Sequence, residues 1–137
     1  MSGILNLTQH AASADQVAAG VIDIGAEDRA DLAALLTFEV CPTLADVIAR
    51  AERIAAIAAY ADERTLCDED SQDGMVRWDR AMIGGAPWLM RPLADALRAE
   101  GIEPLFAFSL RESVDSVQPD SSIRKTAVFR HAGWVPA

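Results

Sequence analysis

The sequence is short of basic side chains, and this shortage excludes one class of partner. Its 137 residues include 12 lysines and arginines against 21 aspartates and glutamates, which gives a formal charge of −9. A protein that coats duplex DNA or anionic lipid presents a broad basic face to the phosphates. We therefore expect neither duplex DNA nor a membrane as a partner, whereas a small anionic ligand is compatible with this composition.

Cysteine is also scarce, with only Cys41 and Cys67 in the chain. Neither stands in a CxxC or other paired metal spacing with His10 or His131, so we expect no metal site and reduced thiols. The N-terminus lacks the basic and apolar stretches of a signal peptide, and no segment reaches the roughly 18 continuous apolar residues of a membrane span. These absences predict a cytoplasmic protein.

Several familiar catalytic and binding motifs are missing as well. The chain has no Walker loop, no GxGxxG fingerprint, no GxSxG nucleophile elbow and no HExxH pair. The acidic run at 68–73 does not have the spacing of an EF-hand. No cofactor is expected on these grounds.

Hydrophobic residues make up 51% of the sequence, which suits a packed domain. A chain of this length buries roughly two thirds of its unfolded surface, so we expect one domain over residues 1–137. The charge is divided unevenly, since residues 1–75 hold 14 acidic and 4 basic side chains and residues 76–137 hold 7 and 8. A site for a phosphate or carboxylate is therefore expected in the C-terminal half.

Apolar periodicity and turn residues predict alternating strands and helices. Ser13 and Gln16 form a capping-box pattern at the start of the first helix, and Pro87 suits the first turn of the last one. Strands are expected at 4–7, 21–24, 80–83 and 102–110, and helices at 14–19, 27–38, 44–61 and 87–100. Residues 62–77 are polar and rich in turn formers, which indicates a surface connection.

The last part of the chain has the pattern of an antiparallel hairpin. Apolar and polar residues alternate after Glu112, a turn is expected at 119–122, and a second strand follows from Ile123 to about Phe129. The strand at 102–110 is continuously apolar, so we expect it to be central and buried on both faces. The fold class is therefore α/β, with a Rossmann-like, mostly parallel sheet flanked by helices and a C-terminal antiparallel β-hairpin.

Ligands of such sheets bind beyond the carboxyl ends of the strands, so we examined the residues that follow each strand. Three clusters are found there: Thr8, Gln9 and His10; Gly84, Gly85 and Ala86; and Ser109 with Arg111. The two glycines allow a ligand to approach the backbone, and the helix that follows presents free N–H groups that favour an anion. A tight strand-to-helix turn explains the same glycines equally well.

The titratable and basic candidates also have two interpretations each. His10 can act as a general base near neutral pH, or it can be an ordinary surface residue. Arg111 can hold a phosphate with Ser109 as a hydroxyl donor, or it can pair with Glu112 or another acid. Basic groups gather in the hairpin as Arg124, Lys125, Arg130 and His131. Arg124 and Lys125 suit solvated side chains that protect a strand edge from aggregation, whereas Arg130 and His131 are expected to end their strand.

Four segments together resemble a known family: Asn6 to His10, Met82 to Pro87, Phe106 to Arg111 and Val128 to His131. They look like the small CARF-like proteins that accompany type III CRISPR systems, a group that includes ring nucleases. The similarity covers the first strand and residues 79–135 but not residues 35–75. The chain departs from the pattern at Phe108, where a second small hydroxyl residue is expected, and this departure concerns the cleavage chemistry more than the fold.

The resemblance implies a homodimer that binds cyclic oligoadenylate across its two-fold axis and, in some members, cleaves it without metal. Ser109, Arg111 and His10 would then be catalytic, while Thr8, Gln9, Gly84, Gly85, Ala86, Arg130 and His131 would bind the ligand. The ribose 2′-hydroxyl would attack the adjacent phosphorus in line, with His10 or His131 moving the proton.

Three other functions are open at this point. The same site can bind a nucleotide second messenger without turnover, as a sensor or sponge. A Rossmann-like scaffold can also carry a different small-molecule enzyme, and the acidic half can be the working surface of a protein-interaction factor. The fold does not choose among these functions.

Overall fold

The computed structural model describes residues 3–65 and 78–137. The strands are β1 (Ile4–Asn6), β2 (Val21–Asp23), β3 (Arg80–Met82), β4 (Glu103–Val117) and β5 (Ile123–Pro136), and the helices are α1 (Ala14–Ala18), α2 (Ala26–Leu36), α3 (Leu44–Thr65) and α4 (Pro87–Ala99). The expected capping box opens α1, because Ser13 accepts a hydrogen bond from the amide of Gln16 and the Gln16 side chain accepts one from the amide of Ser13. None of the helices in the described segments is long and apolar enough to cross a membrane.

The five strands form one sheet in the order β2-β1-β3-β4-β5. The first four strands of this order are parallel, and β5 lies antiparallel to β4 at the edge. The expected fold class is therefore confirmed. The chain leaves β1 toward β2 on one side and returns to β3 on the other, so the order reverses between β1 and β3, and sheets of this kind bind ligands at such a point.

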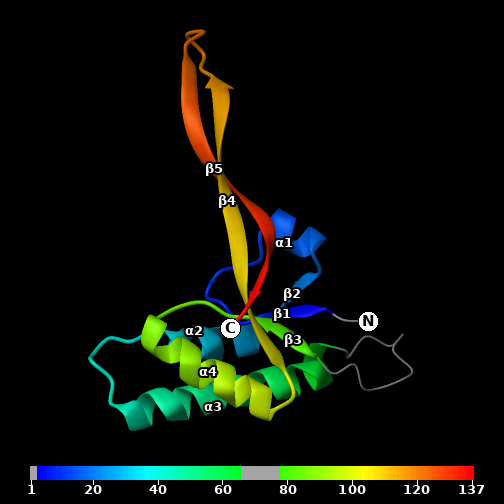
Figure 1. Cartoon of the computed structure of the whole chain (residues 1–137), viewed down its shortest axis with the longest axis vertical. Coiled ribbons are helices and arrows are strands. Elements are labelled where there is room, and N and C mark those ends of the chain that lie inside the picture. Colours follow the sequence, from blue (N-terminus) through cyan, green and yellow to red (C-terminus); the bar gives the residue numbers. More distant parts are fainter. Residues whose placement is uncertain (1–2, 66–77) are drawn as a thin grey trace.

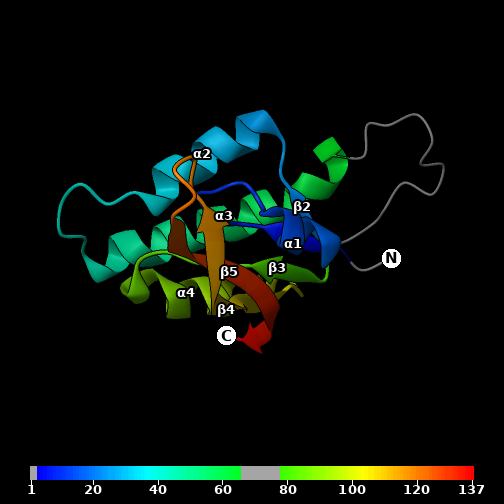
Figure 2. The ribbon, with the colours of Figure 1, turned by 90° about the horizontal axis from the view of Figure 1, so that it is seen from above.

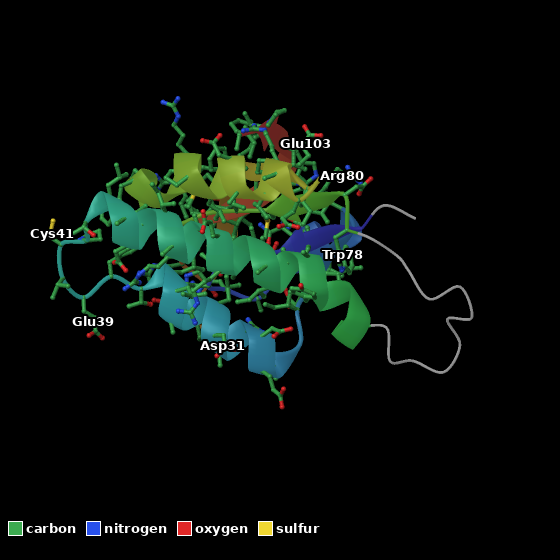
Figure 3. All side chains as sticks on the ribbon, turned by 90° about the horizontal axis from the view of Figure 1, so that it is seen from below. Asp31, Glu39, Cys41, Trp78, Arg80 and Glu103 are labelled. Atoms are coloured by element: carbon green, nitrogen blue, oxygen red, sulfur yellow. The ribbon has the colours of Figure 1, made fainter. Side chains whose placement is uncertain are left out.

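Three helices cover one face of the sheet, with α3 between α2 and α4 (Figures 2 and 3). Their buried side chains form the main core with residues of β1 and β3, and the fully buried members include Leu5, Leu32, Ile54, Leu93 and Leu97. On the other face, Ile4, Val21, Met82 and Leu105 form a smaller cluster that Ala12 and Trp134 cover in part. The core is therefore concentrated between the sheet and one helical layer.

The strands β4 and β5 extend far beyond the sheet as a two-stranded ribbon, which we call the arm (residues 106–135; Figure 1). The last residue of β4 that pairs with β3 is Leu105, opposite Met82. The expectation that residues 102–110 are buried on both faces is wrong beyond this pair, because Phe106 is only partly buried and the following residues from Phe108 to Val117 are exposed. The predicted hairpin is confirmed, but its first strand continues the sheet strand without a break.

The turn at the tip of the arm lies where the sequence predicts it. The amide of Ser121 donates to the carbonyl of Gln118 at 2.9 Å, and Ser121 has a φ of 67°. The Ser122 hydroxyl donates to the Asp120 carboxylate at 2.5 Å, and hydrogen bonds from the Ser122 side chain and backbone lower the pKa of Asp120. The tip is thus held by local hydrogen bonds alone.

The helix α3 differs from its prediction at both ends. It continues to Thr65, so residues 62–65 belong to the helix and not to the expected connection; residues 66–77, with Cys67, lie outside the described part. At its start, Leu44 is 72% exposed and Ile48 is 42% exposed, although their spacing places them on the apolar stripe. Both residues line an open groove between α3 and α4, so the neighbouring helix does not cover them.

One arginine of α3, Arg50, ties this helix to the end of α2. Nη1 of Arg50 donates to the backbone carbonyls of Leu35 at 3.2 Å and Thr37 at 2.7 Å. Its guanidinium lies 4.4 Å from the ring centroid of Phe38 and 3.4 Å from the Asp46 carboxylate. Arg50 thus satisfies carbonyl groups that the end of a helix leaves without intrahelical partners.

Candidate functional site

A cavity of about 490 Å³ opens at the carboxyl ends of β1 and β3, beside the residues at which β4 leaves the sheet. Its walls are the loop after β1, the loop after β3 and the start of the arm, and its lining is Thr8, Gln9, His10, Ala11, Gln16, Met82, Ile83, Gly84, Gly85, Phe106 and Ala107. Five of the predicted site residues, namely Thr8, Gln9, His10, Gly84 and Gly85, therefore meet around one space. The cavity lies where the strand order reverses, and its lining holds no charged side chain other than the titratable His10.

A buried asparagine holds the loop that forms one wall. Asn6, which is 3% exposed, donates from Nδ2 to the His10 carbonyl and to Oδ1 of Asp23, both at 2.8 Å. Its Oδ1 accepts hydrogen bonds from the Thr8 amide at 2.9 Å and the Thr8 hydroxyl at 2.7 Å. The same Asp23 oxygen accepts from the Ala12 amide at 3.1 Å. Neighbouring strand ends therefore fix both ends of the loop at 7–12.

Neither Asn6 nor Asp23 was among the site residues predicted from the sequence. The signal was nevertheless present, because Asn6 is the polar interruption of an otherwise apolar strand, and a buried amide needs hydrogen-bond partners. What the sequence alone does not show is the pairing of Asn6 with Asp23 in the parallel register of β1 and β2. Both residues position the cavity wall and do not line it.

The network leaves some side chains of the loop free and engages others. Thr8 uses its hydroxyl within the network, and Nε2 of Gln9 donates to the Thr37 hydroxyl at 3.0 Å. His10 is exposed, and only its backbone carbonyl takes part in the hydrogen bonds around Asn6. The imidazole of His10 is therefore available to a ligand in the cavity.

The two glycines after β3 play different parts. Gly85 has a φ of 142°, which side chains rarely allow, and lies close to Met90 and Leu36. Gly84 has no such backbone constraint, and a Cβ there would lie 3.5 Å from Cγ2 of Thr8, which is ordinary contact. Ala86 caps α4 without lining the cavity and packs, partly buried, against the main core. Gly85 is thus needed by the turn, whereas Gly84 leaves open space at the cavity.

We expect Gly85→Ala to destabilise the protein by about 1–2 kcal/mol, since a positive φ is costly for a residue with a side chain. Gly84→Ala should change the free energy of unfolding by less than about 0.5 kcal/mol, because it creates neither strain nor a clash. Urea unfolding followed by circular dichroism measures both values. Equal effects of the two substitutions would contradict the assignment of the turn constraint to Gly85.

The predicted pair Ser109 and Arg111 lies on the arm. Arg111 was predicted to follow the end of a strand. This prediction is wrong, because β4 continues past Arg111 to Val117. Its guanidinium makes no ion pair or hydrogen bond with any described residue, and Glu112, the expected alternative partner, pairs instead with Arg130 at 3.2 Å. Ala107 of the cavity, Ser109 and Arg111 alternate along β4, so they share one face of the arm.

The pairing of β4 with β5 sorts the remaining candidates between the two faces of the arm. His131 lies opposite Ser109 and Phe129 opposite Arg111; we call this side the Arg111 face. The His131 ring lies 4.5 Å from the Trp134 ring, and its buried Nδ1 has no hydrogen-bond partner among the described residues. Arg130 lies on the opposite side of the arm, so it does not share a face with His131. Both residues were predicted to end their strand, but β5 continues to Pro136.

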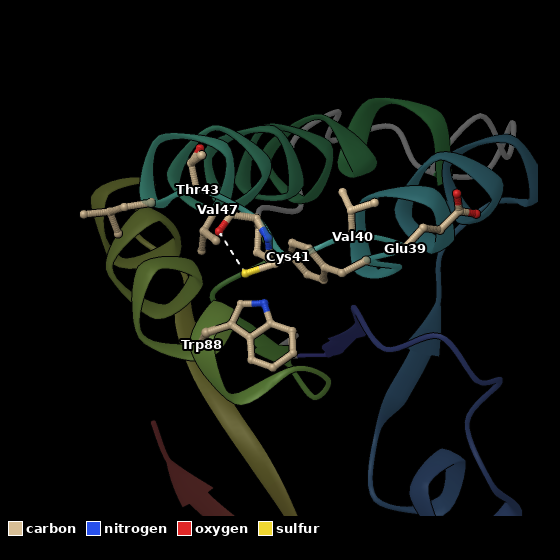
Figure 4. A pocket seen from close by; sticks show the side chains of 9 residues that line it. Glu39, Val40, Cys41, Thr43, Val47 and Trp88 are labelled. Atoms are coloured by element: carbon tan, nitrogen blue, oxygen red, sulfur yellow. Dashed lines mark hydrogen bonds between the residues drawn. The ribbon is translucent and has the colours of Figure 1, made fainter.

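A second cavity of about 620 Å³ lies between the loop at 37–43 and the start of α4 (Figure 4). Its walls are mostly apolar, with Trp88 on one side and Val40 and Cys41 on the other. The Cys41 thiol is exposed and its sulfur lies 3.9 Å from the Pro42 carbonyl. None of the predicted site residues lies here, and the strand-end cavity has the more convergent polar groups.

Within residues 3–65 and 78–137, no three or more His, Cys, Asp or Glu side chains are grouped so that they could hold a metal ion. The strand-end cavity and the adjoining face of the arm supply an imidazole, amides, hydroxyls and a guanidinium.

Comparison with known proteins gives one family. A family model described as Uncharacterized protein MJ1673 family matches residues 2–135, which is nearly the whole chain. No curated protein and no solved structure gives a match.

Proposed function

We propose a function from the geometry of the site, taking as its premise that the chain belongs to the Uncharacterized protein MJ1673 family. In this proposal the protein binds a cyclic oligoadenylate second messenger in the strand-end cavity and along the Arg111 face, and opens the ring without metal. The observation that carries the proposal is the convergence of His10, Gly84 and Gly85 on one cavity that continues into the face with Ser109 and Arg111. The CARF-like resemblance of the same segments supports the choice of ligand.

The dimensions of this surface favour a ligand with several phosphates. A cavity of about 490 Å³ suits one nucleotide unit in volume. Arg111 lies four residues beyond Ala107, which is roughly 13 Å along the strand at about 3.3 Å per residue. A ligand that contacts both His10 and the Arg111 guanidinium is therefore larger than a mononucleotide.

Each candidate group has a defined task in the cleavage. The 2′-oxygen attacks the adjacent phosphorus, the bond to the 5′-oxygen breaks, and a 2′,3′-cyclic phosphate and a free 5′-hydroxyl result. Arg111 and Ser109 donate to the phosphate oxygens as negative charge develops on them. His10 accepts the 2′-proton, and the imidazole of His131, which lies opposite Ser109 on the Arg111 face, returns a proton to the 5′-oxygen.

Binding without turnover is the second candidate, for a sensor or sponge of the same messenger. It is favoured by the separation of His10, in the cavity, from Arg111 on the arm, because in-line attack needs the base and the phosphate donors around one phosphorus. The proposal also includes a homodimer, as the resemblance implies.

The test uses radiolabelled cyclic tetra-adenylate, incubated with the full chain in EDTA and resolved by chromatography. We expect linear products, loss of turnover in Arg111→Ala, and retained turnover in Arg124→Ala, a matched change near the tip on the other face of the arm. If the wild-type protein leaves the cyclic tetra-adenylate ring intact, the enzyme proposal is wrong.

Calorimetry with the same ligand separates the remaining possibilities. We expect Gly84→Val, which fills the cavity without a forced backbone change, to weaken binding at least tenfold (about 1.4 kcal/mol). Stoichiometric binding without products supports the sensor or sponge. No binding of any cyclic oligonucleotide contradicts both candidates and directs attention to a different ligand or to a protein partner.

A further inference from the structure

A groove on the helical layer is open to solvent and lies apart from the strand-end cavity. It has a volume of about 720 Å³ and runs between α3 and α4, which lie side by side in Figure 3. We call it the α3–α4 groove; its walls are Leu44, Ile48, Glu52 and Ala55 of α3 and residues of α4 from Arg91 to Glu100. None of the residues in its walls lines the strand-end cavity.

Exposed apolar side chains gather at the end of the groove where α3 begins. Leu44 and Ile48 are both exposed there. Leu44 also lines the neighbouring cavity with Val40 and Trp88, which are 79% and 54% exposed, so the two hollows adjoin at this residue. Large apolar side chains grouped on a concave surface are typical anchor points for a protein partner.

The other end of the groove is negatively charged. Glu52, Asp95 and Glu100 lie in its walls, against Arg91 as the one basic residue of the lining. Asp95 has an exposed contact with Arg98 at 3.9 Å, whereas the carboxylates of Glu52 and Glu100 form no ion pair with any described residue. The carboxyl end of α4 adds a partial negative charge here, because this helix ends at Ala99.

The hollow on the other side of α3 shows what distinguishes this groove. The lining between α2 and α3 carries two acidic and two basic side chains, namely Asp31, Asp46, Arg50 and Arg53. Its one large apolar residue, Leu35, is buried. That hollow therefore offers neither exposed apolar anchors nor a net charge, and the α3–α4 groove offers both.

We propose that the α3–α4 groove binds an amphipathic, basic helix of another protein. The apolar side chains of this helix contact Leu44 and Ile48, and its lysines or arginines contact Glu52 and Glu100. The helix-in-groove mode of recognition uses this combination of apolar anchors on one face and charged groups beside them.

Charge selects a basic partner over a second copy of this chain. Residues 1–105 hold 18 acidic and 8 basic side chains, so the body that carries the groove is itself negative. Two copies that met through the same groove would bring two negative surfaces together. Residues 66–77, which lie outside the described part, hold four acidic side chains and one basic, so the groove repels this segment as well.

The length of the groove suits about three turns of a helix. From Leu44 to Ala55 the axis of α3 rises roughly 17 Å at about 1.5 Å per residue. A helix of that length places apolar residues at i, i+4 and i+7 along the groove. The small side chains of Ala55, Ala96 and Ala99 let the partner approach closely at the acidic end.

The inference goes beyond the proposed ligand chemistry and does not depend on it. The groove and the strand-end cavity share no residue, and peptide binding is measured without any nucleotide. Loss of peptide binding and loss of nucleotide binding are therefore separate observations.

The test uses two fluorescent 18-residue peptides and the full chain, with binding followed by anisotropy at 150 mM salt. The first peptide has leucines at helical spacing and lysines elsewhere, and the second has glutamates in place of the lysines. We expect the lysine peptide to bind at least about twentyfold more tightly than the glutamate peptide. Its affinity should fall as salt is raised, because the charged contacts are exposed.

Matched variants separate the groove from the general acidity of the chain. Glu52→Lys should weaken binding of the lysine peptide at least about fivefold, whereas Asp31→Lys makes the same charge change on α2 and should have little effect. Ile48→Lys should weaken it at least about tenfold, whereas Val17→Lys alters an equally exposed apolar residue on α1 and should not. Circular dichroism confirms that the variants are folded.

Four results would overturn the inference. The first is no binding of the lysine peptide below about 100 µM, and the second is equal affinity for the two peptides. The third is an equal effect of Ile48→Lys and Val17→Lys, or of Glu52→Lys and Asp31→Lys, which would mean that general electrostatic attraction explains the binding. The fourth is self-association of the wild type that Ile48→Lys abolishes in sedimentation equilibrium, since the groove would then take a second copy.

Discussion

Asn6→Asp is expected to destabilise the protein by about 3 kcal/mol at pH 7, although it replaces one atom by another of almost equal size. The substitution removes the donor at 2.8 Å from Oδ1 of Asp23 and places two carboxylates in contact at a half-buried position. A lost hydrogen bond to a charged group costs about 1.5–3 kcal/mol, and repulsion between the carboxylates adds to it.

The effect of Asn6→Asp should depend on pH in a defined direction. The introduced carboxyl, held against Asp23, keeps its proton to a higher pH in the folded state than in the unfolded chain. The variant is therefore most stable below the unfolded pKa of about 4 and loses that stability as pH rises through the raised folded pKa. Urea unfolding at several pH values measures this trend.

The control for this prediction is Gln9→Glu, the same amide-to-acid change on an exposed side chain of the same loop. We expect it to change the free energy of unfolding by less than about 1 kcal/mol at any pH, because it removes only the exposed hydrogen bond to the Thr37 hydroxyl and the new charge stays in water. If Asn6→Asp proves as mild as Gln9→Glu at pH 7, the hydrogen-bond network does not hold the cavity wall.

The second large effect is expected for Arg50→Ala, which should lower the free energy of unfolding by about 2–3 kcal/mol. It removes hydrogen bonds to the carbonyls of Leu35 and Thr37, the contact with the Phe38 ring and the ion pair with Asp46. Hydrogen bonds from a charged donor contribute about 1.5–3 kcal/mol, and the cation–π contact adds about 0.5–1 kcal/mol. The surface ion pair contributes little.

Thermal unfolding provides the measurement, with an expected decrease in Tm of roughly 10 °C for a chain of this size. Arg50→Lys should retain the charge but lose the forked geometry and fall between Arg50→Ala and the wild type. Arg53→Ala, an exposed arginine one turn further along α3, should leave the Tm nearly unchanged. An equal effect of Arg50→Ala and Arg53→Ala would mean that the link between α2 and α3 contributes nothing.

Local signals predicted much of the fold correctly. The capping box at Ser13 and Gln16, the helix beginning at Pro87 and the turn at 118–121 depend on neighbours within a few residues. The position of the cavity followed from a general property of parallel sheets, which collect the residues after their strands at one edge. His10 and Gly84 could therefore be placed together from sequence alone.

The errors arose where a distant neighbour decides the outcome. Residues 106–117 are a free ribbon because β3 ends at Met82, and no pattern within β4 records where β3 stops. Arg130 lies inside β5, opposite Leu110 and beside Glu112, and does not end its strand, because β5 continues to Pro136 along β4 in a register that includes an irregularity between Phe108 and Ser109. Leu44 and Ile48 are exposed because the groove between α3 and α4 stays open at these positions.

The hydrogen bonds around Asn6 also bear on the speed and entropy of ligand capture. A wall that is already fixed by its strand ends loses little conformational freedom when a ligand arrives, so most of the interaction energy appears as affinity. Association then needs no slow rearrangement on that side, and its rate should approach the range of about 10⁵–10⁷ M⁻¹s⁻¹ typical of preformed sites. Any slow step in binding would then arise in one of the other two walls, the loop after β3 or the start of the arm.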